Sequence, residues 1–417
     1  METLLVIIFL VLFLGESGAR WLLEQLNIRH MLRHGRDIPP VFAGAVDPAT
    51  VTRMADYTAD CSRLDFRENR TRDLIELAVL FGALPVLTVR LGHLAFPLIA
   101  QALIFFTVLA LIGFLAGLPF DVYRTFVLEK KYGFSTVTWR LWLIDQIKSL
   151  VLSAVLLAIL VSALMAFILW LPGCWWFWGW VFFAVFQIVL LWLYPVLIAP
   201  LFNTFAPIAD DVLRKEITAL LQRAGLTAGG IYQVDEGKRS RHTNAYFTGF
   251  GKTKRIVLYD TLLASHTPEE IVAVLAHEIG HWKGRHLLKQ LALLIPAALA
   301  VFYGLGRVVA WPPLYAAFGI SGTPVYAGLF VASVYLAAAG FFLKPLVAAV
   351  TRRFEREADA LAVELTGTAR PLIGALRRLA KDNLRNLHPH PWYVLFFYTH
   401  PPLVERLEYL QAMDYKK

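Results

Sequence analysis

The chain has 417 residues, of which 58% are hydrophobic and only 17% charged, and its formal net charge is +9 at pH 7. This composition is too apolar for an ordinary soluble domain and predicts an integral membrane protein. The positive charge of so apolar a chain suits anionic lipid headgroups, so we expect membrane lipid as a partner and no nucleic acid. The two cysteines, Cys61 and Cys174, lie in dissimilar segments, which excludes a disulfide framework and a cysteine zinc cage.

Seven apolar segments are predicted to cross a bilayer as helices. They cover residues 1–19, 74–90, 98–118, 149–170, 175–200, 287–310 and 325–350. The first, Leu4 to Leu14, also has the length of a signal peptide, with Ser17-Gly18-Ala19 as a small-residue cleavage site. Because Glu2 stands where a signal peptide carries basic residues, a retained anchor is favoured.

The remaining segments are polar. We expect a basic loop at residues 20–73, a second polar loop at 119–148, a larger segment at 203–286 and a C-terminal segment at 351–417. Nearly all Lys and Arg residues follow the first, third, fifth and seventh spans. The positive-inside rule therefore predicts an outside N-terminus and puts 203–286 and 351–417 on the cytoplasmic side.

The segment 203–286 contains the motif His277-Glu278-Ile279-Gly280-His281. Residues four apart share a helix face, so His277 and His281 can bind one metal ion, with Glu278 placed to take a proton from water at that ion. Upstream, Thr267-Pro268-Glu269-Glu270 predicts a helix start with a capping box, and an apolar run follows it. The alternative is an amphipathic helix whose histidines satisfy core hydrogen bonds, but the motif in this setting favours a zinc hydrolase.

Two histidines need a third protein ligand. The metzincin spacing has Gly284 in place but requires a histidine where Leu287 stands, so His286 is interpreted as a polar residue at the start of the sixth span. A carboxylate is the other source. Glu355 and Asp359 lie four apart just past the seventh span, where Glu355 can bind zinc and Asp359 can accept the outer N–H of a zinc-binding histidine. Taken alone, this segment is better explained as the solvated charged face of a basic helix.

Short motifs are spread along most of the chain. They are Phe126-Val127-Leu128-Glu129, Tyr132-Gly133-Phe134-Ser135, Pro200-Leu201-Phe202-Asn203, Asn244 to Gly249, His277 to Lys283, Glu355 to Asp359, Lys381-Asp382-Asn383-Leu384 and Tyr398 to Leu407. In this order they resemble the motifs of the type I CAAX prenyl proteases, which are membrane-integrated zinc metalloproteases related to the heat-shock membrane protease HtpX. So many ordered matches exclude coincidence.

The resemblance implies a set of site residues. His277, His281 and Glu355 match the ligands of one zinc ion (Zn2+) per chain, and Glu278 matches the general base. His400 matches a residue that the family places near the tetrahedral intermediate. Without the resemblance, His400 would be only a loop histidine before two prolines.

The stretch Asn244, Ala245, Tyr246 and Phe247 is similar to the family's edge strand, which would pair with an extended substrate by β-augmentation. The local pattern agrees, because Asn244 to Phe250 and Arg255 to Tyr259 flank the turn Gly251-Lys252-Thr253-Lys254 and predict a hairpin. A purely structural hairpin is the alternative.

The fold that the resemblance implies is mainly α and polytopic. Seven long tilted transmembrane helices would form a barrel around a large water-filled chamber, closed on the cytoplasmic side by a gluzincin-like zinc metalloprotease domain with a small β-sheet. In this arrangement residues 203–286 carry the substrate strand and the zinc helix, and 351–417 complete the protease domain.

The implied activity is that of a zinc metalloendopeptidase. It would cleave peptide or protein substrates that are prenylated on the cysteine of a C-terminal C-a-a-X motif, releasing the last three residues, and would act as a monomer. Its location would be the cytoplasmic membrane of a bacterium or the endoplasmic reticulum membrane of a eukaryote. One alternative is a quality-control membrane protease of broad specificity without a prenyl requirement. Another is a seven-span transporter or channel with a non-catalytic zinc domain, against which the intact motif argues.

Overall fold

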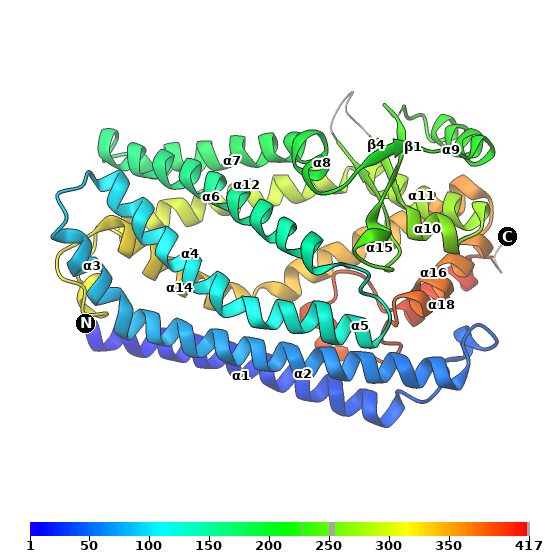
Figure 1. Ribbon diagram of the computed structural model, residues 1–417, viewed down its shortest axis with the longest axis horizontal. Coiled ribbons are helices and arrows are strands. Elements are labelled where there is room, and N and C mark those ends of the chain that lie inside the picture. Colours follow the sequence, from blue (N-terminus) through cyan, green and yellow to red (C-terminus); the bar gives the residue numbers. More distant parts are fainter. Residues whose placement is uncertain (228, 250–254, 415–417) are drawn as a thin grey trace.

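The computed structural model describes residues 1–227, 229–249 and 255–414. Long helices run side by side along the molecule, and a small sheet with shorter helices gathers at one end, on the right of Figure 1. The long helices are α1 (Glu2–His34), α2 (Pro48–Ala78), α4 (Leu98–Tyr123), α6 (Trp139–Trp170), α7 (Trp175–Leu193), α12 (His286–Val308), α14 (Val325–Phe341) and α15 (Lys344–Thr366).

Shorter elements connect these helices and build the other end of the molecule. The shorter α-helices are α3 (Leu84–Gly92), α5 (Glu129–Lys131), α8 (Ala199–Phe202), α9 (Asp211–Arg223), α10 (Asp260–Ser265), α11 (Pro268–Lys283), α13 (Pro312–Ala316), α16 (Arg370–Asp382), α17 (Pro391–Phe397) and α18 (Leu403–Asp414). The 3-10 turns are η1 (Pro40–Phe42) and η5 (Glu236–Lys238), and the π-helical turns are η2 (Val79–Ala83), η3 (Arg124–Leu128) and η4 (Tyr194–Ile198). The strands are β1 (Phe205–Pro207), β2 (Ile231–Val234), β3 (Ala245–Thr248) and β4 (Arg255–Tyr259).

The long helices carry the membrane-spanning segments. In the described residues, 6 helical stretches are long and apolar enough to cross a membrane, and a seventh forms if α14 and α15, bent by 57°, count as one span. The most apolar part of α12 has 0% of its residues buried, and that of the α7 stretch only 6%. Apolar side chains that face outward need lipid rather than water around them. The expected polytopic, mainly helical fold is therefore confirmed.

Residues 20–73, which we expected to be a polar loop, are mostly helical. Helix α1 runs on to His34 and α2 starts at Pro48, so a short connection separates two long helices. Ion pairs hold the charged side chains on these helices: Arg124 pairs with Asp65 and Glu68, and Arg20 pairs with Asp73. Much of 119–148 is also helical, since α4 extends to Tyr123 and α6 begins at Trp139. The change to polar composition marks where each apolar stretch ends, but the helices continue beyond that point.

Two hydrophobic cores lie at opposite ends of the long helices. One is rich in aromatic side chains from α1, α4, α13 and α14, including Phe9, Phe105, Tyr315 and Tyr326. The other joins the sheet to α9, α11 and α16 through aliphatic side chains such as Ile217, Ile256 and Leu275. Helix α11, which carries the His277–His281 motif, packs on this second core, and the core fixes that helix against the sheet.

The sheet has four strands in the order β1-β2-β4-β3. Strand β2 pairs in parallel with β4, and the other pairings are antiparallel. The predicted hairpin is confirmed in its pairing, with Ala245 opposite Leu258 and Thr248 opposite Arg255. Its expected turn, Gly251 to Lys254, lies outside the described residues. Strand β3 is at the edge of the sheet, which leaves one side of its backbone available for pairing.

Helix α11 begins with the predicted capping box. The Thr267 side chain accepts a hydrogen bond from the Glu270 backbone N–H, and the Glu270 side chain accepts one from the Thr267 backbone N–H. Pro268 occupies the first turn, where its missing N–H costs nothing. The Glu270 carboxylate also accepts hydrogen bonds from the Arg378 guanidinium of α16, which links the start of α11 to that neighbouring helix.

Replacing Thr267 with Ala is expected to destabilise the protein by about 1 kcal/mol, because the Glu270 N–H loses its acceptor. The measurement is reversible unfolding in detergent micelles. Thr218→Ala is the control, since the exposed Thr218 hydroxyl donates to the Arg214 carbonyl of its own helix; its change should stay below about 0.5 kcal/mol. Equal effects of the two substitutions would contradict the role of the cap.

Candidate metal centre and active site

The three predicted metal ligands come from two helices that pack closely against each other. Helix α11 holds His277 and His281, and α15 holds Glu355. At the crossing point Gly280 faces Ala358, and a Cβ atom at position 280 would lie only 2.7 Å from Ala358 Cα. The absence of a side chain at Gly280 therefore permits the approach that brings the histidines within reach of Glu355.

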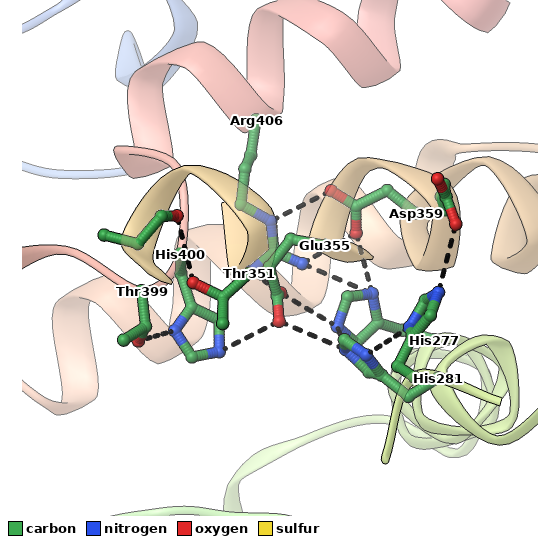
Figure 2. A network of polar contacts seen from close by, with 11 residues as sticks. His277, His281, Thr351, Glu355, Asp359, Thr399, His400 and Arg406 are labelled. Atoms are coloured by element: carbon green, nitrogen blue, oxygen red, sulfur yellow. Dashed lines mark hydrogen bonds and ion pairs between the residues drawn. The ribbon is translucent and has the colours of Figure 1, made fainter. Parts of the chain in front are cut away.

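The three predicted ligands converge. Nε2 of His277 lies 3.2 Å from Nε2 of His281 and 3.3 Å from Oε2 of Glu355, and Nε2 of His281 lies 3.1 Å from Oε1 of Glu355. Figure 2 shows both imidazoles pointing from α11 toward this carboxylate. In the described residues they form the one group of three or more His, Cys, Asp or Glu side chains placed to hold a metal ion.

The donor set fits zinc. Tetrahedral ligands at zinc–nitrogen distances of about 2.0–2.1 Å lie about 3.3 Å from one another, close to the spacing found here. Glu355 is 5% exposed, and its buried Oε2 makes no hydrogen bond within the part of the chain that the structure describes. Two imidazoles and one carboxylate with a buried, unbonded oxygen are a donor set typical of catalytic zinc sites, so these residues fit zinc.

His277 is held from behind by a buried ion pair. Its Nδ1 lies 2.8 Å from Oδ1 of Asp359, which is fully buried. Arg406 of α18 donates to both oxygens of Asp359, from Nη2 at 2.7 Å and from Nε at 3.0 Å. The expectation that Asp359 receives the outer N–H of a zinc-binding histidine agrees with this geometry, which turns Nε2 of His277 toward Glu355.

Arg406 is a site residue for which no role is predicted from the sequence. It lies within the matched motif Tyr398 to Leu407, but nothing in the local pattern shows that its guanidinium is buried against Asp359, 47 residues earlier. Burial lowers the pKa of Arg406, but the charge of Asp359 and its hydrogen bonds outweigh burial and raise that pKa above its ordinary value. The pair is therefore ionised.

Glu278 lies one position after His277 and is partly buried. Burial raises the pKa of Glu278 above its ordinary value, while the charges of His277 and His281 oppose that rise. A carboxylate with a raised pKa beside metal ligands has the property that a general base needs.

His400 approaches the same centre from the loop before α18. Its Nε2 lies 3.2 Å from Oε1 of Glu355, and its Nδ1 lies 3.0 Å from the Thr399 hydroxyl oxygen. The His400 side chain is 61% exposed, more than the side chains of the three predicted ligands. It is thus close enough to face a substrate bound at the centre and open enough to be reached by one.

The predicted substrate strand lies next to the metal helix. Ala245, Tyr246 and Phe247 belong to the edge strand β3, and Asn244 immediately precedes it, with its carbonyl accepting from the Tyr259 N–H. The rings of Phe247 and Trp282 are 5.9 Å apart, which joins β3 to the C-terminal end of α11. The structure therefore brings the predicted metal, acid–base and strand residues to one end of the molecule.

His286 lies closer to the centre than the sequence suggested. We interpreted it as a polar residue at the start of a span, and it does begin α12, but it is 3% exposed and contacts His281. The spacing rule for a third histidine excluded it as a ligand and gave no reason to expect a contact with one.

Comparison with known proteins covers almost the whole chain. Residues 27–204 match the model described as the CAAX prenyl protease N-terminal domain with five membrane helices, and residues 207–414 match that of peptidase family M48. The chain is 36% identical to a CAAX prenyl protease 1 homolog of Oryza sativa subsp. japonica, with 91% of each covered. It is 33% identical to one of Homo sapiens, with 92% of this chain and 91% of the relative covered.

The structure is also similar to a solved one. The crystal structure of S. mikatae Ste24p superposes with a TM-score of 0.88 at 29% sequence identity, covering 96% of this chain and 99% of that one. The relatives, the two domain matches and the ligand group lead to the same conclusion. The chain belongs to peptidase family M48, as an integral membrane zinc metalloprotease with the N-terminal domain of the CAAX prenyl proteases.

Proposed function

We propose that this protease removes the last three residues of proteins whose C-terminal C-a-a-X cysteine is prenylated. The observation that carries the proposal is the convergence of His277, His281 and Glu355 beside Glu278, in a chain matched along its length by proteins named CAAX prenyl proteases. A peptidase site of this kind supplies the chemistry, and the relatives' names indicate the substrate class.

His277, His281 and Glu355 would hold the zinc ion. When bound, zinc supplies a Lewis acid that polarises a scissile carbonyl and lowers the pKa of water to about 7. Asp359 keeps the Nδ1 proton of His277 directed away from the ligand triangle, with Arg406 neutralising its charge. Glu355 presents its carboxylate to both histidines.

Glu278 acts as the general base and then as the general acid. It takes the proton of the water that adds to the scissile carbonyl carbon, and it returns that proton to the amine released when the C–N bond breaks. His400 directs Nε2 toward the same centre and would donate to the carbonyl oxygen as negative charge develops there. Its exposed position suits a group that must meet the substrate.

Strand β3 would hold the substrate in extended form. The free side of an edge strand offers N–H and C=O groups to a peptide backbone, and the residues of Asn244 to Phe247 would line that pairing. The contact between Phe247 and Trp282 supports the assignment, because it links the strand to the helix that carries the metal ligands.

The protease would act as a monomer surrounded by lipid, with its active site toward the cytoplasm. The support for this orientation is the concentration of Lys and Arg after the first, third, fifth and seventh spans. Accessibility of a cysteine introduced at exposed Asp211 of α9, probed in sealed vesicles of known orientation, would test it.

Purified protein in detergent should release the last three residues from a farnesylated C-a-a-X peptide and act much less on its unprenylated twin. Glu278→Gln should abolish this cleavage, because the amide cannot accept the proton, while its zinc content stays at that of the wild type. Product masses and metal analysis provide the readouts.

Equal cleavage of both peptides, or cuts at other bonds, would replace the prenyl-protein proposal with a protease of broad specificity. Near-normal turnover by Glu278→Gln would remove Glu278 from the general-base role. A wild-type protein without zinc and without cleavage would favour the transporter or channel alternative.

His400→Ala is expected to lower kcat by roughly a hundredfold or more, with a small change in KM, because a donor to the developing oxyanion is lost. Zinc content should not change, since His400 is not among the three ligands. Thr399→Val is the control: it removes the hydroxyl at His400 Nδ1 and leaves the imidazole. An effect confined to KM would contradict a transition-state role.

Zinc affinity is expected to rise with pH. Burial disfavours the charged form of His277, but the neighbouring carboxylates of Asp359 and Glu355 outweigh burial and raise the pKa of His277 to about 9. Below that pH a bound metal must displace a proton, so the dissociation constant should fall by up to about tenfold per pH unit and level off above pH 9. Chelator competition from pH 6 to 9 measures it, and a flat profile would contradict the prediction.

A further inference from the structure

The second zinc histidine is held from behind by a different pair of residues. Nδ1 of His281 lies 3.0 Å from Nδ1 of His286, and Nε2 of His286 lies 3.1 Å from Oε2 of Glu357. His277 has its carboxylate in direct contact, whereas His281 reaches a carboxylate through a second imidazole. The two histidines of one motif are therefore supported by separate networks, each of which includes a carboxylate of α15.

The connection between α11 and α12 places His286 beside His281. Arg285 adopts the left-handed conformation, with φ of 52°, so the chain turns sharply before α12 begins at His286. A Cβ atom at position 284 would lie 2.4 Å from Nε2 of His286, so a larger residue there would displace this imidazole. The imidazole stacks on Phe354, with ring centroids 4.3 Å apart and planes at 8°.

With a metal ion at Nε2 of His281, the contacts allow one consistent arrangement of protons. A nitrogen that binds metal carries no proton, so the proton of the neutral His281 ring would lie on Nδ1 and be donated to Nδ1 of His286. His286 then carries its own proton on Nε2 and donates it to Glu357. Each link has one donor and one acceptor, and reversing either link would leave the metal-facing nitrogen of His281 protonated.

We infer that His286 and Glu357 are positioning residues for the zinc ligand His281. This inference rests on the proposed function, because it takes His281 as a ligand. A partner that accepts the outer N–H of a ligating histidine fixes the ring's orientation and tautomer, and its loss typically costs 10- to 100-fold in metal affinity. Glu357 is 40% exposed and also contacts Lys289 and Arg353, so its part should be weaker than that of the buried His286.

The decisive comparison uses His286→Phe and His286→Asn. Phe keeps a ring to stack on Phe354 but has no acceptor for His281, whereas Asn loses the ring and keeps an oxygen near the place of Nδ1. A positioning role predicts that Phe weakens zinc binding about tenfold or more and that Asn recovers much of the loss. A packing role predicts the reverse order.

Glu357→Ala should weaken zinc binding in the same direction by a smaller factor. Lys289→Ala is its matched control, since it removes another partner of Glu357 and leaves the contact with His286. Zinc affinity is measured on the full-length protein in detergent by chelator competition. The visible spectrum of the Co2+-loaded protein reports on ligand geometry, and thermal unfolding monitors the fold.

Zinc binding by His286→Phe within twofold of the wild type, with an unchanged Co2+ spectrum, would overturn the inference and leave the proposed function intact. If His286→Phe does not fold, the comparison of Glu357→Ala with Lys289→Ala decides. Weaker zinc binding by Glu357→Ala alone supports the inference, and equal zinc affinities of the two variants overturn it. Failure of the wild type to bind zinc would instead remove the proposed function on which the inference rests.

Discussion

The site depends on the close packing of α11 against α15. Glycine at 280 and alanine at 358 remove the side-chain volume that ordinarily holds two helices about 8–10 Å apart, and the His277, His281 and Glu355 side chains can then meet. The capping box fixes where α11 begins, and the hydrophobic core beneath it fixes its rotation. Because both helices are rigid, the ligand geometry is set by backbone packing rather than by flexible loops.

Residues that act through local periodicity were predictable from the sequence. The pairing of His277 with His281, the start of α11 and the pairing of β3 with β4 follow from spacings of four and two residues. Glu355 and Asp359 needed the resemblance as well, because a charged helix face looks the same whether it is solvated or buried. Their contacts with His277 show which of the two applies here.

Long-range burial was not predictable. Arg406 meets Asp359 across 47 residues, and His286 reaches His281 only because Arg285 turns the chain with a positive φ, and none of these features has a local sequence signal. The expected loop at 20–73 was wrong for a related reason: ion pairs between α2 and its neighbours stabilise helices whose composition is that of a loop. The composition of a segment indicates whether its side chains meet water, whereas its contacts with neighbouring elements determine whether the segment is helical.

The ion pair between Asp359 and Arg406 has a consequence for biosynthesis. Asp359 is fully buried, and a buried carboxylate without its partner is costly, so burying Asp359 between α11 and α15 is unfavourable until Arg406 of α18 is in place. The chain carries its two histidines and its glutamate well before that point. A molecule without α18 would therefore contain the three predicted zinc ligands but lack the arginine that pairs with Asp359 behind His277.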